Sequence, residues 1–330
     1  FMGALLGKFG EAIVGFPGGD NIGPRPIDQH IKGFKALGAH VEEKENTVHI
    51  TTGPEGLHGA RIFFDLVSVG ATINVLLAAV KAKGLTIMEN VAREPEIVDL
   101  ATFLNNMGAH IRGAGTNEIR VQGVDSLKSM NVHTIIPDRI EAGTYLSFAA
   151  ANGNGVLVKN VITEHLDPFL SKLEEMGVRM EIDEDEIYVP GGDVLSPVNI
   201  KTSPFPGFAT DLQQPITPLL MQARGSSTII DTLYPERTKH IPEMQRMGAK
   251  ISSKDGIITV GHSTDLSGTV VEAGEIRAGV SLVGLALMAK GTTVINKADN
   301  ILRGYDRIVE KFRGLSVDLE VINESESLNH

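Results

Sequence analysis

The 330-residue chain contains no cysteine. This absence excludes disulfide bonds, thiolate metal ligands and a cysteine nucleophile, and it fits a reducing cytoplasm, which we expect as the location. The chain also lacks an apolar run as long as a membrane span, since Gly70, Thr72 and Asn74 interrupt the run at residues 69–80. Basic residues are few: 30 Lys and Arg against 41 Asp and Glu give a net charge of −11, which argues against a broad surface for nucleic acid.

What the sequence does contain is an internal repeat of about 70 residues. A helical pattern that ends at a glycine recurs at Gly38, Gly108, Gly177 and Gly248, and a fifth copy has Ser316 in place of the glycine. Glycine at this point suits the left-handed backbone position that follows many helices. The copies are therefore predicted to fold alike.

Each copy predicts the same order of elements. An apolar strand opens it, at residues 12–14, 85–87, 156–158, 228–230 and 294–295. An amphipathic helix follows, and then two short strands joined by a tight turn such as Asp255-Gly256. A second helix, rich in small residues, closes the copy at 68–79, 140–151, 212–223 and 277–289. We expect these second helices to be buried beneath the sheets, because small side chains on all sides permit close packing.

The copies divide into two lobes. One copy ends and the next begins within residues 134–138, so we place the first lobe at 1–135 and the second at 136–330. The first lobe then has two copies and the second has three. Two equal lobes need six copies, so we expect a further copy before residue 1. Without that copy the first lobe should expose a face that invites self-association.

One loop of the first lobe combines flexibility, an acid and a cation. It is Gly18-Gly19-Asp20-Asn21-Ile22-Gly23-Pro24-Arg25-Pro26-Ile27-Asp28. Its glycines allow positive φ and a close approach of the backbone to a ligand, and Pro26 suits the first turn of the helix that follows. Arg25 is thus placed beside a helix N-terminus, where phosphate or carboxylate binds. Taken alone, the same composition is more often only a turn.

Three further segments carry a resemblance. They are Ala92-Arg93-Glu94-Pro95-Glu96-Ile97-Val98-Asp99, Pro137-Asp138-Arg139-Ile140-Glu141-Ala142-Gly143-Thr144 and Arg303-Gly304-Tyr305-Asp306-Arg307-Ile308. With the loop, they resemble the UDP-N-acetylglucosamine enolpyruvyl transferase family over essentially the whole chain. The resemblance implies two inside-out α/β barrel domains, each built of βαβαββ repeats around buried helices.

The resemblance also implies an activity. In that family the enolpyruvyl group of phosphoenolpyruvate passes to the 3-hydroxyl of UDP-N-acetylglucosamine, and phosphate is released. This is the first committed step of peptidoglycan synthesis, and hence of cell-wall biogenesis, cell shape and cell division. The partners implied are these two small-molecule substrates, and no cofactor is implied.

The chemistry needs an acid and a base. The resemblance gives Asp20 the role of proton donor to the methylene carbon of phosphoenolpyruvate, at a position where the family usually has cysteine. A carboxylic acid can do this if loop closure and loss of water raise its pKa. Members with aspartate here escape fosfomycin, which alkylates the thiol. Asp211 resembles the family's base for the attacking hydroxyl; from the residues alone it is an N-terminal helix residue, and the two roles are compatible.

The resemblance implies two sets of binding residues. The clamp for the phosphate and carboxylate of phosphoenolpyruvate comprises Arg25, Arg237, Arg277 and Arg303, of which Arg25 and Arg303 also count as catalytic. The nucleotide sugar is expected along Arg25, Pro26, Ile27, Asp28, Val67, Ser68, Val69, Gly70, Asp211 and Leu233. Leu66 departs from the family, which commonly has lysine there, and this weakens the expected electrostatic hold on the nucleotide.

Two other functions stay open. The first is an inactive fragment or paralogue that only binds nucleotide sugar. The resemblance implies that the expected missing repeat carries a lysine–asparagine pair and another arginine that contact phosphoenolpyruvate. The second is 5-enolpyruvylshikimate 3-phosphate synthase, which shares the fold and the cosubstrate; the motifs around residues 25–28 and Asp211 favour the sugar nucleotide. The ten histidines show no ligand spacing, so we expect no metal.

Overall fold

The computed structural model describes residues 1–16, 18–20, 22–24, 26–129 and 132–322. The chain forms two compact units. Unit 1 comprises Phe1–Gly19, Pro24–Pro137 and Pro204–Gly207, and unit 2 comprises Asp20–Gly23, Asp138–Ser203 and Phe208–His330. The expected lobe limits, with two repeats in one lobe and three in the other, stay a prediction.

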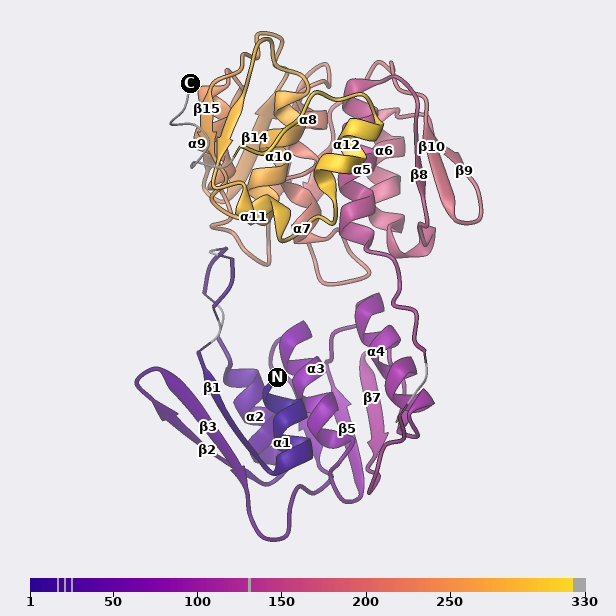
Figure 1. Cartoon of the computed structure of the whole chain (residues 1–330), viewed down its shortest axis with the longest axis vertical. Coiled ribbons are helices and arrows are strands. Elements are labelled where there is room, and N and C mark those ends of the chain that lie inside the picture. Colours follow the sequence, from indigo (N-terminus) through magenta and orange to yellow (C-terminus); the bar gives the residue numbers. More distant parts are fainter. Residues whose placement is uncertain (17, 21, 25, 130–131, 323–330) are drawn as a thin grey trace. The chain divides into compact units, whose positions relative to one another are not determined.

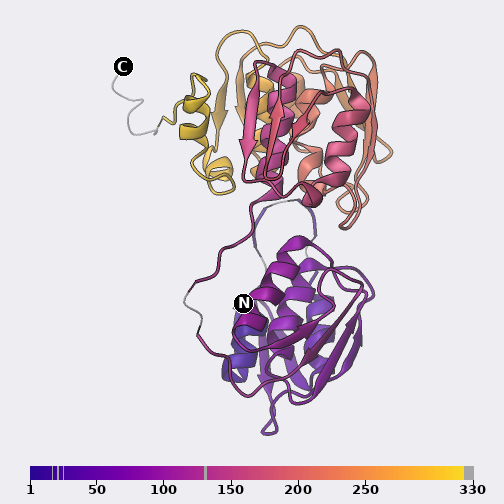
Figure 2. The ribbon, with the colours of Figure 1, turned by 90° about the vertical axis from the view of Figure 1, so that its right-hand side faces the viewer.

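The described part of unit 1 places helices inside and sheets outside (Figures 1 and 2). Its helices are α1 (Met2–Phe9), α2 (Asp28–Ala36), α3 (Val69–Ala79) and α4 (Pro95–Asn106). One antiparallel sheet has the order β1–β3–β2, from β1 (Glu11–Gly15), β2 (Ala39–Lys44) and β3 (Thr47–Thr52). The other has the order β4–β5–β7–β6, from β4 (Arg61–Phe63), β5 (Leu85–Glu89), β6 (His110–Arg112) and β7 (Glu118–Gln122). Helix α3 packs against the other three helices and carries the fully buried Val75 and Leu76.

Unit 2 repeats this arrangement in its described residues. Its helices are α5 (Arg139–Asn152), the 3-10 helix Thr163–His165, α6 (Asp167–Met176), α7 (Thr210–Gln213), α8 (Thr217–Leu220), α9 (His240–Arg246), α10 (Ile276–Ala286), α11 (Asp299–Leu302) and α12 (Ile308–Gly314). Its sheets are β8–β10–β9, β11–β12–β14–β13 and the pair β15–β16. The strands are β8 (Val156–Lys159), β9 (Glu181–Ile182), β10 (Glu186–Val189), β11 (Asn199–Lys201), β12 (Ser226–Ile230), β13 (Ile251–Lys254), β14 (Ile257–Gly261), β15 (Val270–Glu272) and β16 (Val294–Asn296).

The repeat pattern predicted these elements well. The five opening strands are β1, β5, β8, β12 and β16. The four closing glycines adopt φ between 89° and 100°, and Ser316 adopts the same left-handed region at φ 62°. Asp255 and Gly256 both have positive φ and join β13 to β14, as a tight hairpin turn requires.

One predicted helix is wrong. Residues 212–223 form two short helices, α7 and α8, because Pro215 and Pro218 lack the N–H groups that a continuous helix would use. The other second helices, α3, α5 and α10, are mostly buried as expected. A side chain at Gly143 of α5 would lie 2.7 Å from Cδ2 of Leu212, which shows why a small residue is needed there.

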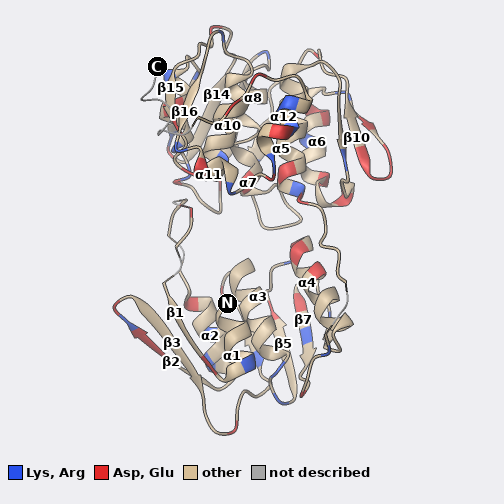
Figure 3. Ribbon diagram, viewed as in Figure 1, with Lys and Arg blue, Asp and Glu red and all other residues tan. Residues whose placement is uncertain are grey.

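The described strands form small open sheets, with no closed barrel among them. None of the helices in the described ranges is both long and apolar enough to cross a membrane. Within the same ranges no three His, Asp or Glu side chains are grouped as metal ligands would be. Figure 3 shows acidic and basic residues interspersed over the elements of each unit.

Candidate active site

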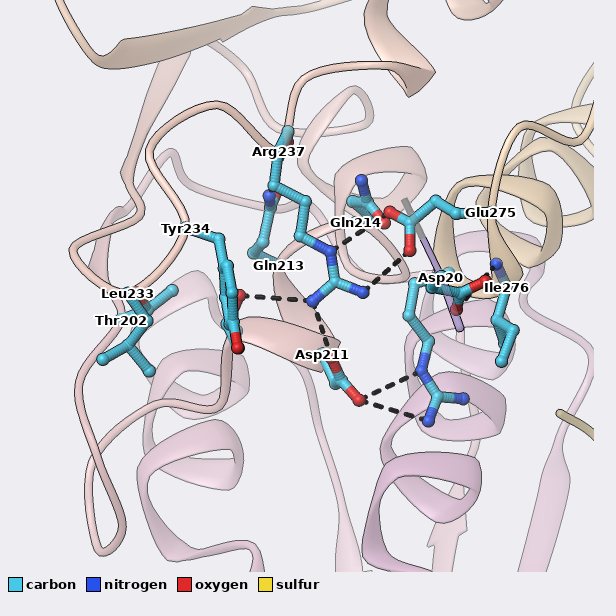
Figure 4. Close-up of polar contacts among 12 residues, drawn as sticks. Asp20, Thr202, Asp211, Gln213, Gln214, Leu233, Tyr234, Arg237, Glu275 and Ile276 are labelled. Atoms are coloured by element: carbon cyan, nitrogen blue, oxygen red, sulfur yellow. Dashed lines mark hydrogen bonds and ion pairs between the residues drawn. The ribbon is translucent and has the colours of Figure 1, made fainter. Parts of the chain in front are cut away.

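Three consecutive residues at the start of α10, Glu275, Ile276 and Arg277, each contact a different charged side chain. Figure 4 labels the first two of them. The carboxylate of Glu275 accepts hydrogen bonds from Nε of Arg237 at 3.1 Å and from its Nη2 at 2.9 Å. The N–H of Ile276 donates to Oδ2 of Asp20 at 3.3 Å. The guanidinium of Arg277 lies 3.3 Å from Asp211. The first N–H groups of a helix have no partner within it, so this segment is free to bind groups from elsewhere.

Asp211 lies in the first turn of α7, as expected. Its Oδ1 accepts from Nη1 of Arg237 at 2.6 Å, and its Oδ2 accepts from Nε and Nη2 of Arg277 at 3.4 and 3.3 Å. Burial by itself raises the pKa of Asp211, but the two guanidinium groups outweigh burial and hold this pKa below its ordinary value. Asp211 is therefore an ionised acceptor at neutral pH.

Arg237 is held on two edges. It is 3% exposed, with Glu275 on one edge, while its Nη1 donates to both Asp211 and Oγ1 of Thr210. These contacts occupy four of the five N–H groups of the guanidinium. A buried cation paired with two carboxylates is fixed in orientation, so Arg237 also orients Asp211.

The loop after β12 is shaped by Asp231. Its Oδ1 accepts from the N–H groups of Leu233 and Tyr234 at 3.0 and 2.9 Å, which is the hydrogen-bonding pattern of an Asx turn. Its Oδ2 accepts from the hydroxyl of Thr210, the residue before Asp211. One carboxylate therefore links the loop that carries Leu233 to the helix that carries Asp211.

Asp20 belongs to unit 2 and lies at the same helix start. Its carboxylate pairs with Nη2 of Arg303, which follows α11, and accepts from the N–H of Ile276. Asp20 and Asp211 thus contact adjacent residues of one segment, since Ile276 and Arg277 are neighbours in the chain. The structure brings together five of the predicted site residues: Asp20, Asp211, Arg237, Arg277 and Arg303.

Arg277 keeps one guanidinium nitrogen without a hydrogen-bond partner. Its Nη1 is buried, and none of the described residues accepts a hydrogen bond from it. The guanidinium lies over the ring of Tyr305, with its carbon 5.1 Å from the ring centroid, and the Tyr305 hydroxyl is 3.0 Å from Oγ1 of Thr144. The ring fixes the guanidinium, which leaves a buried positive donor for an anion to satisfy.

A buried histidine lies next to this cluster. His240 opens α9 and is fully buried, with its Nδ1 3.2 Å from Nε2 of Gln214. Burial, assisted by the positive charge of Arg237, lowers the pKa of His240 to about 3. The ring is therefore neutral and adds no second positive charge beside Arg237.

This neutral ring predicts a pH-dependent stability. The unfolded chain binds a proton at His240 near pH 6.5, whereas the folded chain does so only near pH 3, so folding loses stability as the pH falls through that window. Because of His240, we expect the free energy of unfolding to fall by about 2 kcal/mol when the pH is lowered from 7 to 5. Urea denaturation of the parent and of His240→Asn should show a flatter pH slope in the variant, and equal slopes would contradict the neutral ring.

The other predicted binding residues are placed in unit 1. Ser68 caps α3, with its Oγ accepting from the N–H of Ala71 at 3.2 Å, which confirms the expected helix start. Asp28 begins α2. Pro26, the buried Ile27, Val67, Val69 and Gly70 belong to the same unit. Arg25 lies outside the described residues. The roles of all these residues stay predictions.

The weaker electrostatic hold on the nucleotide that Leu66 implies stays a prediction. Leu66 is 62% exposed. Beside it, Asp65 pairs with Nζ of Lys32 from α2 at 2.7 Å. Lys32 lies on another element, so local sequence patterns did not show this ion pair.

Sequence reasoning also missed several supporting residues of the site. The available signal for Glu275 was an acid two positions before Arg277, a predicted anion-binding residue. Asp231 begins an Asp-Thr-Leu-Tyr segment typical of an Asx turn. Nothing local marked His240 or Thr210 as neighbours of Arg237.

Comparison with known proteins first identifies the class of enzyme to which this fold belongs. A family model described as EPSP synthase (3-phosphoshikimate 1-carboxyvinyltransferase) matches residues 1–312. The enolpyruvyl transferase NikO from Streptomyces tendae has a similar structure, with a TM-score of 0.84 at 24% identity over 96% of this chain and 75% of that one. An EPSP synthase from Acinetobacter baumannii has a TM-score of 0.67 at 19% identity, over 95% of this chain and 76% of that one. The fold is that of the enolpyruvyl transferases, as predicted.

Two relatives narrow the class to a family. A UDP-N-acetylglucosamine 1-carboxyvinyltransferase 2 from Lactiplantibacillus plantarum is 64% identical over 99% of this chain and 76% of the relative. A UDP-N-acetylglucosamine 1-carboxyvinyltransferase from Streptococcus pneumoniae is 55% identical over 98% of this chain and 77% of the relative. The chain belongs to the UDP-N-acetylglucosamine 1-carboxyvinyltransferase family of transferase enzymes.

Proposed function

We propose that this protein transfers the enolpyruvyl group of phosphoenolpyruvate to the 3-hydroxyl of UDP-N-acetylglucosamine and releases phosphate. The observation that carries the proposal is the cluster at the start of α10, where Asp20 and Asp211 are held among Arg237, Arg277 and Arg303. The names of the relatives, at 55 and 64% identity, support the same reaction.

Asp211 enters the reaction ionised and acts as a base, whereas Asp20 enters it protonated and acts as an acid. Asp211 takes the proton of the sugar hydroxyl, whose oxygen then forms a bond to C2 of phosphoenolpyruvate, while Asp20 gives a proton to C3. The resulting adduct loses phosphate from C2 as C3 returns a proton to Asp20, and the double bond forms again. The proton on Asp211 leaves with phosphate or to water, so both groups return to their starting state.

The arginines supply the positive charge that the two anionic groups of phosphoenolpyruvate require. Arg303 is paired with Asp20 in the structure, and an anionic substrate offers Arg303 another partner, which frees Asp20 to carry a proton. The unpartnered Nη1 of Arg277 is a ready contact for the same anion. For the nucleotide sugar we retain Leu233, Arg25 and the predicted residues at 26–28 and 67–70.

Phosphate release tests the proposal. Phosphoenolpyruvate is supplied with UDP-N-acetylglucosamine or with shikimate 3-phosphate, and release is measured for this chain and for a form extended at its N-terminus. Release with the sugar nucleotide supports the proposal. Release with shikimate 3-phosphate alone identifies the shikimate enzyme, and binding of the sugar nucleotide without release in either form identifies a non-catalytic paralogue.

We also propose that the reaction takes place in the cytoplasm.

We further propose that copies of the chain associate with one another through unit 1. The apolar side chains of Phe9 and Ile13 in this unit support the association, because they are 66% and 60% exposed. Sedimentation velocity over a concentration series should show a dimer or larger species that Phe9→Ser with Ile13→Thr reduces. A single monomeric species at every concentration would overturn it.

A further inference from the structure

Glu275 has no part in the proton transfers proposed above, yet it is the most deeply buried carboxylate of the cluster. It is 1% exposed, and both of its oxygens are directed to one guanidinium. A charge is kept in such a place only when its partner compensates for the lost hydration. The partner is Arg237, which itself contacts Asp211.

The geometry makes Glu275 and Asp211 competitors for Arg237. A guanidinium forms its most favourable pair with a carboxylate through two parallel hydrogen bonds. Glu275 has that arrangement, through Nε and Nη2, whereas Asp211 receives only Nη1 of Arg237. A carboxylate with two parallel bonds is a weaker base than one with a single bond, because each bond stabilises the ionised form.

We propose that Glu275 is a positioning residue, which holds Arg237 by its Nε–Nη2 edge so that Asp211 meets only one nitrogen of that guanidinium and keeps enough basicity to accept the proton of the substrate. The inference rests on the proposed function for the role of Asp211. It assigns Glu275 no contact with substrate.

The charges around Asp211 set the direction of the expected effect. Arg237 and Arg277 face it directly, and Tyr305 lies against Arg277. Glu275 affects Asp211 through Arg237, and Asp138 affects it through the charge of Arg277. The ion pair of Asp20 and Arg303 lies at Ile276, the residue before Arg277. Removing the charge of Glu275 takes away a like charge and releases the guanidinium edge, and both changes lower the pKa of Asp211.

Carbon-13 NMR of protein labelled at the aspartate carboxyl carbons tests this without requiring turnover. The Asp211 signal is identified by its loss in Asp211→Asn, and its titration midpoint is measured in the parent, Glu275→Gln, Glu275→Asp and Glu272→Gln. Glu272 is a matched control, since it is an exposed carboxylate of β15 that pairs with Lys297 outside the site.

We expect the midpoint to fall by about one pH unit in Glu275→Gln and by less in Glu275→Asp, and to stay unchanged in Glu272→Gln. Turnover by Glu275→Gln should show a kcat about tenfold lower and an acidic limb at lower pH, with KM for phosphoenolpyruvate changed less than kcat. A merely structural role would lower the melting temperature and leave the midpoint in place.

An unchanged or raised midpoint in Glu275→Gln overturns the inference. If that variant does not fold, Glu275→Asp carries the same comparison. A parent that shows no phosphate release with either acceptor contradicts the proposed function, whereas the NMR comparison still decides whether Glu275 controls the Asp211 carboxylate.

Discussion

Replacing Asp20 by asparagine is expected to lower kcat about a thousandfold, because the amide has the size of the acid but no proton to give to C3 of phosphoenolpyruvate. The affinity for phosphoenolpyruvate should hold or rise, since the neutral amide would no longer compensate the positive charge of Arg303. Steady-state kinetics separate the two effects. A variant with near-parental kcat, or one that loses affinity and turnover together, would exclude Asp20 as the acid.

Cysteine, which the family usually has at the position of Asp20, supplies the control. We expect fosfomycin to leave the parent active, because the chain has no thiol to alkylate. Asp20→Cys restores the thiol of the family pattern, and fosfomycin should label it covalently and stop its turnover. Mass spectrometry of intact protein shows the adduct, and labelling of the parent would refute the prediction.

The second large effect is expected at Asp211. Asp211→Asn removes the acceptor for the hydroxyl proton and should lower kcat by about a thousandfold. It also leaves Glu275 as the only carboxylate partner of Arg237 among the described residues and leaves Arg277 with none among them, so the free energy of unfolding should fall. Activity and urea denaturation are measured on the same preparation.

A matched control separates these two consequences. Asp193 is also an ion-paired aspartate of unit 2, bound to Arg179 at 2.5 Å outside the site. Asp193→Asn should lose some stability and retain turnover. Equal kcat values for the two variants would show that Asp211 has no role in the chemistry.

Local sequence patterns predicted most of the fold because each element depends on residues close in the chain. The 70-residue repeat placed the opening strands, and the left-handed φ of the closing glycines follows from their place after a helix. Ser316 adopts a left-handed φ as well, so the backbone conformation after the helix is the same even where the residue is not glycine. The predicted helix at 212–223 was wrong because Pro215 and Pro218 interrupt a segment whose small and apolar residues favour a helix.

The site was predictable only in part, for a related reason. Asp20, Asp211 and the arginines were found through motifs, but their contacts join residues far apart in the sequence. Asp20 and Arg303 are 283 positions apart, and Arg237 and Glu275 are 38 apart. Periodicity carries no information on such pairs. Glu275 therefore went unassigned, although Arg277, two residues further along the chain, had been predicted as a binding residue.

One measurement tests the central claim that Asp20 delivers a proton to C3. The reaction is run in heavy water, and the vinyl hydrogens of the enolpyruvyl product are followed by NMR. Protonation of C3 produces a methyl group, so the later loss of a proton leaves solvent deuterium in the methylene position. We predict deuterated product from the parent and none from Asp20→Asn over matched times. Product formed by the parent without deuterium, or deuterium incorporated equally by the variant, would contradict the account.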